Sequence, residues 1–555
     1  MSATQITLYP AIRTKQPHIK RPSEAISERK SKELVIAFAG PIGCGIKAVK
    51  ERLIEQLKAS GYSVKEIKIS EYLEECVIQG LIPNTEAIKQ TNKADRYIQL
   101  QDAGNSLRIS QSDILAEYAI KRIAETRTKE IKDETESVTD YIPIRTAYII
   151  DQLKHQDEVS LLRAVYGNLF YLFGVLSTST RRSTRLKTDG IPPDRIPELV
   201  ERDRKQREKN GQQLDKALQL ADFFIRNDHA NAEAIENQII RSVHLIHGAN
   251  GISPTKEEYG MYSAYASGLR SACLSRQVGA SIMNNDGIII ATGRNDVPKG
   301  GGGLYGPEDG IGDARCVKLE NAQCHNDFHK QKLVNNIEEI IRTTLNSAIT
   351  DICGNATEDQ KAFLQQIHID ELSNKIACSA YDDTRLGGLI EFSRSIHAEM
   401  DAIVSLASKG GGGTKGTTLF TYTFPCHNCA RHIVAAGIRQ VYYLEPYEKS
   451  LAVELHGDAI NVDGQRGGLG DELESREQVE FLHFEGVAPR QYLNMFTPSG
   501  ERKDGNGKAV KTNVRTAEKK IPEYLDDYRE YELKVVAHLL NVINELKEKG
   551  LPKKG

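Results

Sequence analysis

Hydrophobic and polar positions alternate along the first half of the chain in the manner of a parallel α/β sheet. Apolar runs of strand length are separated by stretches with helical periodicity, and they cover residues 34–39, 63–69, 146–151, 168–176 and 221–227. Continuous apolar runs of this length are typical of strands that are buried on both faces. Strands that alternate with helices favour a parallel sheet, so we predict a parallel α/β domain over residues 32–247.

A second pattern begins near residue 255. Residues 261–274 are predicted as a helix, and residues 278–283 and 288–292 as two strands. The strands are joined by Asn284-Asn285-Asp286-Gly287, and Asp-Gly at such a position is a hairpin signal.

Helix, strand, helix and strand follow over residues 397–444, after a long interruption at residues 298–383. Unstructured loops of that length are uncommon inside a compact domain. We therefore interpret residues 255–500 as a second α/β domain that carries an insertion at about 298–383.

The remaining segments are polar. Residues 1–31 are rich in proline and basic residues, and we predict a disordered arm there because they offer too little apolar surface to order themselves. Residues 501–521 contain seven Lys and Arg against three acids. This segment is predicted to be a basic linker, with a nucleic-acid patch as the alternative. Residues 522–549 show apolar positions at spacings of three and four, which predicts a C-terminal amphipathic helix.

Composition and charge narrow the functional classes only slightly. The chain has 73 Lys and Arg against 76 Asp and Glu, so no global field favours nucleic acid or an anionic membrane. No apolar run approaches the roughly 20 residues that cross a bilayer, and a cytoplasmic protein without membrane contact is expected. Nine cysteines at irregular spacings favour metal binding or catalysis over a disulfide framework.

The strongest chemical motif is His397-Ala398-Glu399 followed by Pro425-Cys426-His427-Asn428-Cys429. Two thiolates and one imidazole form a three-ligand zinc site with a fourth position left open for water, as catalytic zinc requires. Pro425 suits the first position of a helix, so Cys426 is expected at a helix N-terminus, which favours its thiolate. A structural zinc ribbon would need a second C-x-x-C pair, and the sequence has none.

Glu399 lies two residues from the predicted ligand His397. At that spacing its carboxylate can reach a water at the open position without being a ligand, and can move a proton to the substrate ring and to leaving ammonia. The signature H-x-E with P-C-x-x-C is that of zinc deaminases, in which a glutamate has this role. Glu399 is therefore the predicted catalytic residue.

The residues around the motif resemble the deoxycytidylate deaminases. The resemblance rests on Thr423 to Ala430, on Ser275-Arg276-Gln277-Val278-Gly279-Ala280 and on Ala291-Thr292-Gly293-Arg294-Asn295. It implies a cytidine deaminase-like α/β/α domain that hydrolyses the 4-amino group of a free deoxycytidine nucleotide, dCMP, dCTP or both. It also places Asn295 at the sugar and makes Arg276 a phosphate candidate, although a solvated loop arginine explains Arg276 equally well.

The amino-terminal half contains a loop, Gly40-Pro41-Ile42-Gly43-Cys44-Gly45, that resembles a Walker A loop. The lysine is displaced to Lys47 and the usual hydroxyl residue is absent, but the backbone N–H groups could still cradle a nucleotide phosphate. Asp151, at the end of an apolar strand, is placed like a Walker B acid, with a capping or surface aspartate as the alternative.

Three arginines, Arg181, Arg182 and Arg185, resemble the lid of nucleoside monophosphate kinases, so residues 32–247 are interpreted as a P-loop kinase-like domain with a regulatory function. Joined to the deaminase-like half, it is similar to the two-domain deaminases of anti-phage defence, which deplete dCTP and dCMP. That similarity implies a homo-oligomer and, in some members, a regulatory RNA.

Three alternatives remain open. Cys316, Cys324, His325 and His329 could hold a second, structural zinc in the insertion. The protein could be a polynucleotide cytidine deaminase, although the absence of tryptophan and 6% aromatic residues offer little for base stacking. It could also be a nucleotide-binding sensor or kinase with a degenerate deaminase half, against which the intact zinc motif argues.

Overall fold

The computed structural model describes residues 21–82, 93–130, 142–204, 213–228, 232–354, 357, 367–410, 413–445, 450–462, 465–466 and 477–550. Most of the arm predicted to be disordered, residues 1–20, lies outside these ranges. Within them, no helix combines the length and the apolar character needed to cross a bilayer.

The first half of the chain alternates strands and helices. Its elements are α1 (Pro22–Glu28), β1 (Leu34–Ala39), α2 (Ile46–Ala59), β2 (Ser63–Lys68), α3 (Ile69–Ile78), α4 (Lys93–Ser110), α5 (Ile114–Glu130), β3 (Thr146–Asp151), α6 (Gln156–Tyr166), β4 (Phe170–Leu176), α7 (Ser179–Thr188), α8 (Ile196–Arg204), α9 (Leu214–Gln219), β5 (Phe223–Arg226) and α10 (Ala232–Ile246). All five strands predicted from the sequence are present.

The second half continues with a further set of strands and helices. These are α11 (Lys256–Gly268), β6 (Gly279–Met283), β7 (Ile289–Arg294), α12 (His325–Cys353), α14 (Ile369–Asp382), α15 (Ala398–Ser408), β8 (Thr418–Thr423), α16 (His427–Ala435), β9 (Gln440–Glu445), α17 (Ala452–His456), β10 (Ile460–Val462), β11 (Gln465–Arg466), β12 (Val479–His483), β13 (Gly486–Val487), α18 (Tyr492–Phe496) and α19 (Leu525–Gly550). Helix α11 begins earlier than predicted because Thr255 caps it, its hydroxyl accepting the N–H of Glu258.

The first sheet has the strand order β13-β5-β4-β1-β3-β2. Strands β2, β3, β1, β4 and β5 are parallel, as predicted. The sheet is mixed rather than purely parallel, because β13 pairs antiparallel with β5. Residues 486–487, which form β13, belong to the second domain as predicted from the sequence. Their pairing with β5 therefore joins the two halves of the chain through the first sheet.

The second sheet has the order β11-β10-β12-β9-β8-β6-β7. Strands β10, β12, β9 and β8 are parallel, whereas β6 and β7 form the predicted antiparallel hairpin beside β8. Both sheets have helices on their faces, so the protein is an α/β protein with two mixed sheets.

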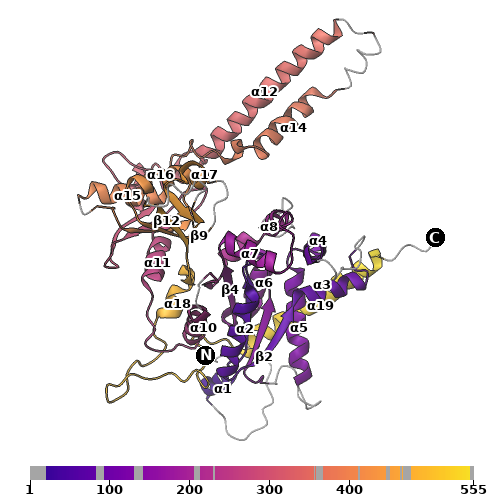
Figure 1. Ribbon diagram of the computed structural model, residues 1–555, viewed down its shortest axis with the longest axis vertical. Coiled ribbons are helices and arrows are strands. Elements are labelled where there is room, and N and C mark those ends of the chain that lie inside the picture. Colours follow the sequence, from indigo (N-terminus) through magenta and orange to yellow (C-terminus); the bar gives the residue numbers. More distant parts are fainter. Residues whose placement is uncertain are drawn as a thin grey trace, which may run out of the picture.

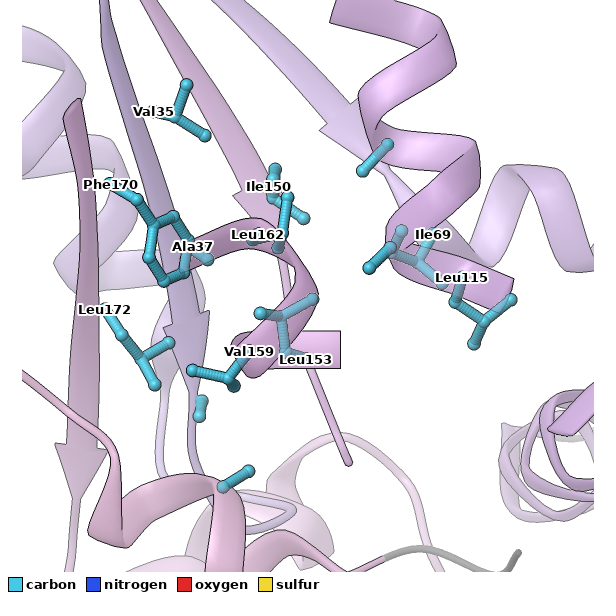
Figure 2. Close-up of a cluster of buried hydrophobic side chains, with 14 of the residues drawn as sticks. Val35, Ala37, Ile69, Leu115, Ile150, Leu153, Val159, Leu162, Phe170 and Leu172 are labelled. Carbon is cyan, nitrogen blue, oxygen red and sulfur yellow. The ribbon is translucent and has the colours of Figure 1, made fainter. Parts of the chain in front are cut away.

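The central strand β1 is buried over its whole length. Alternate residues face opposite sides of the sheet, so each side of β1 contributes to a different apolar cluster. Figure 2 shows one of these clusters, in which Val35 and Ala37 of β1 lie near Ile150 of β3 and the α6 residues Val159 and Leu162. This cluster extends through buried side chains to the second sheet, where it includes Phe420.

The insertion forms a helical hairpin. Helices α12 and α14 lie against each other and extend away from both sheets, as Figure 1 shows in orange and salmon. The sequence predicted an insertion at 298–383 but not this internal structure.

The polar segments at the two ends of the chain are ordered where the structure describes them. Residues 22–28 form α1, contrary to the prediction of a disordered arm through residue 31. The predicted basic linker, residues 501–521, lies along the first half of the chain, where Arg145 donates to the backbone oxygens of Val514 and Ala517. These contacts between the Arg145 side chain and backbone oxygens hold residues 514–517 against the first half of the chain.

Helix α19, which covers the region of the predicted C-terminal helix, lies beside α5 (Figure 1). A buried ion network holds it there. Arg127 of α5 donates to Glu532 of α19 at 2.5 Å and to Glu33 at 2.9 Å. Tyr528 of α19 also donates to Glu33, at 2.5 Å. Each of the three charged residues, Arg127, Glu33 and Glu532, is 3% exposed or less. Water therefore does not solvate their charges, and the charges compensate one another.

We expect Arg127→Met to destabilise the protein by about 3–5 kcal/mol, because two buried carboxylates would lose their cation. The effect should appear as a lower denaturant midpoint and as faster hydrogen exchange in peptides from α19. Lys534→Met is the control, since Lys534 pairs with Glu530 where both side chains are largely exposed. Equal midpoints for the two variants would show that the network does not anchor α19.

Candidate active site

Two helices next to the second sheet begin at residues of the zinc motif. His397 is the N-cap of α15, and Cys426 is the N-cap of α16, which follows directly after β8. Pro425 therefore precedes the cap rather than occupying the first helical position as predicted. Cys426 still lies at a helix N-terminus, where its sulfur accepts the N–H of Cys429 at 3.4 Å.

The three predicted ligands lie together. The Nδ1 atom of His397 is 3.3 Å from Sγ of Cys426 and 3.4 Å from Sγ of Cys429. A zinc ion with ordinary bond lengths and tetrahedral angles would separate a sulfur from a nitrogen ligand by about 3.6 Å. All three ligand atoms lie within 4.8 Å of one another, and both cysteines are buried. The residues therefore fit a zinc ion.

The protonation of Cys426 suits metal binding, whereas the hydrogen bond with Cys426 raises the pKa of Cys429 well above its usual value. Hydrogen bonds from Cys429 and His397 lower the pKa of Cys426 to about 4, so this sulfur is a thiolate at neutral pH. The hydrogen bond with Cys426 raises the pKa of His397 to about 9. The pair is an imidazolium and a thiolate, and a cation bound at the same place takes over the role of the proton.

Glu399 is the second residue of α15 and is 5% exposed. Burial raises the pKa of its carboxyl group to about 7. It is not part of the three-residue ligand group, although it lies close enough to Cys429 for a side-chain hydrogen bond. A carboxyl group with a pKa near neutrality can both accept and donate a proton.

The predicted substrate residues lie on the segment next to the ligands. Asn295 follows β7, and its neighbour Asp296 forms a bridge with Ile396, which precedes His397. The side chain of Asn295 accepts the N–H of Val278 at 2.8 Å and donates to the backbone oxygen of Arg276 at 2.7 Å. Asn295 thus holds the loop that carries Arg276.

Sequence analysis missed Glu445, which terminates β9. Its carboxylate pairs with the guanidinium of Arg276 and accepts the hydroxyl of Thr423 at 3.4 Å. Burial raises the pKa of Glu445. Its position at the carboxyl end of a predicted strand was the available signal, because ligand sites of α/β sheets form there.

The glycine loop after β1 contains two residues in the left-handed conformation. Gly43 and Gly45 have φ angles of +79° and +80°, which side chains rarely tolerate. The N–H of Ile42 donates to the carboxylate of Asp203 at 2.6 Å, and Lys154 donates to the same carboxylate at 2.6 Å. A carboxylate of the chain itself thus binds an amide of this loop.

The loop does not bring its predicted lysine and acid together. The side chain of Lys47 is 85% exposed and lies 3.9 Å from Glu51. Asp151 instead accepts from Lys50 at 2.8 Å. Gly40 is required for close packing, since a Cβ there would lie 2.7 Å from the backbone oxygen of Val175.

The predicted second metal site does not form. Among the described residues, the zinc motif is the only group of three or more potential ligands that are close enough to share an ion. His325 and His329 lie in the first turns of α12 with ring centroids 6.4 Å apart, and Cys316 and Cys324 do not complete a ligand group with them.

Comparison with known proteins points to the same part of the chain. Residues 254–445 match the family described as "Cytidine and deoxycytidylate deaminase zinc-binding region". The deoxycytidylate deaminase of Enterobacteria phage T4 is 30% identical over 191 residues, which make up 34% of this chain and 76% of that protein.

Two further proteins are similar to shorter or longer parts of the chain. ComE operon protein 2 of Bacillus subtilis (strain 168) is 33% identical over 93 residues, 16% of this chain and 49% of that protein, so the chain spans about half of that relative. The solved dCMP deaminase of cyanophage S-TIM5, in complex with dCMP and dUMP, is 18% identical with a TM-score of 0.22, and the match covers 42% of this chain and 100% of that one.

We expect Cys426→Ser and His397→Ala to lower zinc affinity by about tenfold or more, because each removes one of three protein ligands. The measurement is zinc content by elemental analysis after dialysis against a weak chelator. Cys378→Ser is the control, since Cys378 is exposed and outside the cluster. Full zinc retention in Cys426→Ser would show that the ion is bound elsewhere.

Proposed function

Because the chain belongs to the deoxycytidylate deaminase family, a family of hydrolases, we propose that it deaminates free deoxycytidine nucleotides, converting dCMP, dCTP or both to the uracil nucleotides and ammonia. The proposal is based on one observation: the ligand atoms of His397, Cys426 and Cys429 lie close together, and the buried carboxyl group of Glu399 is beside them.

A zinc ion bound by these residues would supply Lewis acidity to activate a water molecule near neutral pH. His397, Cys426 and Cys429 would hold the ion at the N-termini of two helices, α15 and α16. Both cysteines are buried, and His397 is partly buried.

Glu399 moves the protons. Its carboxylate would accept one proton from the water that attacks C4 of cytosine and deliver it to the ring nitrogen, and would then carry the proton of the new C4 hydroxyl to the amine as the C4–N bond breaks. Burial raises the pKa of Glu399 to about 7, so its carboxyl group can both take up and release a proton at neutral pH. The deaminase signature assigns the same function to the glutamate of H-x-E.

Asn295 and Arg276 orient the nucleotide in this proposal. Asn295 lies beside the segment that leads into His397, and its amide contacts fix the loop of Arg276. Arg276 pairs with Glu445, and its side chain is 48% exposed, so part of the guanidinium remains accessible to a substrate phosphate. A polynucleotide substrate has less support, because the chain lacks tryptophan and is poor in aromatic residues for base stacking.

We further propose that the protein serves anti-phage defence by nucleotide depletion. This rests on the resemblance of the two-part chain to such deaminases, with the first half as a regulatory part, a homo-oligomeric assembly and an RNA as a regulatory partner. The polar contacts of the glycine loop within the chain support regulation rather than phosphoryl transfer in the first half.

Replacement of Glu399 by glutamine is expected to lower the deamination rate by about 10²–10⁴-fold while zinc remains bound, because the proton carrier is lost and the ligands are not. The assay measures ammonia release and identifies products chromatographically for dCMP, dCTP, CMP, CTP, deoxycytidine and single-stranded DNA. Glu371→Gln, on the exposed face of α14, is the matched control.

Turnover of a free deoxycytidine nucleotide that disappears in Glu399→Gln would support the proposal. Turnover of single-stranded DNA alone by the zinc-loaded protein would replace it with the polynucleotide alternative.

A further inference from the structure

The carboxylate of Glu445 is fixed close to one part of the zinc motif. Glu445 ends β9, where its backbone oxygen accepts the N–H of Phe424 at 2.7 Å, and Phe424 is two residues before Cys426. The carboxylate itself accepts the hydroxyl of Thr423 at 3.4 Å. Glu445 is buried, and a buried charge needs compensation by a partner of opposite charge.

That partner is Arg276, whose loop is held in place by hydrogen bonds of its own. The backbone oxygen of Arg276 accepts from the side-chain amide of Asn295 at 2.7 Å, and the backbone N–H of Asn295 donates to Val278 at 3.1 Å. The side chain of Gln277 donates to the backbone oxygen of Ser271 at 2.7 Å. These contacts fix the backbone of the loop without the ion pair, so a purely structural role for the pair has little support.

The two members of the pair differ in their access to solvent. Arg276 donates to the carboxylate through one Nη atom. Its side chain is 48% exposed, whereas that of Glu445 is 7% exposed. A guanidinium carries five N–H donors in a planar fork, so Arg276 can hold the carboxylate and also donate to a phosphate on its exposed side.

The pair limits what a ligand gains from its charge. A phosphate group at Arg276 also lies near the carboxylate of Glu445, so each of its negative charges is attracted by one group and repelled by the other. A monophosphate carries about 1.5 to 2 negative charges at neutral pH, and a triphosphate carries more. Without Glu445 the pair would leave one positive charge, and the more highly charged nucleotide would gain most from it.

We propose that Glu445 is a specificity-determining residue of the deaminase site. It orients the guanidinium of Arg276 toward the nucleotide phosphate, and its own charge lowers the affinity for dCTP relative to that for dCMP. The inference rests on the proposed function, which brings the phosphate to Arg276. It names the monophosphate as the nucleotide that the charge of this pair favours.

The test compares the Kd values of dCMP and dCTP by calorimetric titration of the zinc-loaded Glu399→Gln protein, in which turnover is slowed. Adding Glu445→Gln removes one negative charge with little change of shape. We expect the ratio of Kd for dCMP to Kd for dCTP to rise about threefold or more. Because burial raises the pKa of Glu445, the titrations are made at pH 8, so that its carboxyl group is ionised.

Arg276→Gln in the same background should lower this ratio by about threefold or more, because the carboxylate then faces the phosphates without its cation. The Arg276 side chain is half exposed, so this variant decides the question even if Glu445→Gln does not fold. Glu445→Asp keeps the charge and should restore the parent ratio. A structural role alone would weaken both nucleotides equally and would not move the ratio in opposite directions.

Glu454→Gln is the matched control, since Glu454 pairs with Arg385 at 3.0 Å where both side chains are largely exposed. Thermal unfolding midpoints and zinc content identify the variants that are folded and loaded. The proposal is wrong if the ratio is unchanged in folded, zinc-loaded Glu445→Gln or Arg276→Gln. It is also wrong if Glu454→Gln changes the ratio equally, or if neither nucleotide binds.

Ammonia release from dCMP and dCTP is measured in parallel with the unmodified, zinc-loaded protein. Opposite shifts of the ratio without any release would support the assignment of Glu445 as a determinant of nucleotide binding and contradict the proposed function. Release with an unchanged ratio in both variants would do the reverse.

Discussion

One imidazole nitrogen and two cysteine sulfurs lie within 4.8 Å of one another at the start of two helices, and the proposed chemistry depends on this arrangement. A thiolate at Cys426 is favoured by its hydrogen bonds and by the helix N-terminus, and a second sulfur lies beside it. Two sulfurs and one imidazole at this spacing suit a metal cation, and tetrahedral zinc would satisfy all three. Helix α15 packs on β7 and β6, and α16 follows β8, so the pairing of β7, β6 and β8 holds the two helix starts together.

The same sheet connects the zinc site to the first half of the chain. Its parallel strands β9, β10 and β12 end at a cavity whose opposite wall is formed by β4, β5 and the helices after them. Strand β13 and one continuous apolar cluster join the two sheets, so packed side chains connect the two halves of the chain.

Local patterns predicted much of the fold and the metal ligands. Strand β1 is identifiable because burial on both faces requires a continuous apolar run, and His397, Cys426 and Cys429 because zinc ligation restricts residue type and spacing. The bond between Asp203 and Ile42 was not predictable, since Asp203 lies in a charged run that is typical of a solvated helix face. Likewise β13 is two residues long and pairs with β5, which is remote in sequence, and no local pattern encodes such pairing. The polar segment at residues 501–521 is ordered by Arg145, whose partners there are backbone oxygens that carry no sequence signal.

Hydrolytic deamination is tested most directly by the origin of the new oxygen. The zinc-loaded protein is incubated with dCMP and dCTP in water enriched in ¹⁸O, and the products are identified by mass spectrometry. The account predicts a uracil nucleotide with a single ¹⁸O at C4, an unlabelled phosphate and one ammonium ion per product. Unchanged dCMP and dCTP in the presence of bound zinc, or label in the phosphate instead of the base, would contradict it.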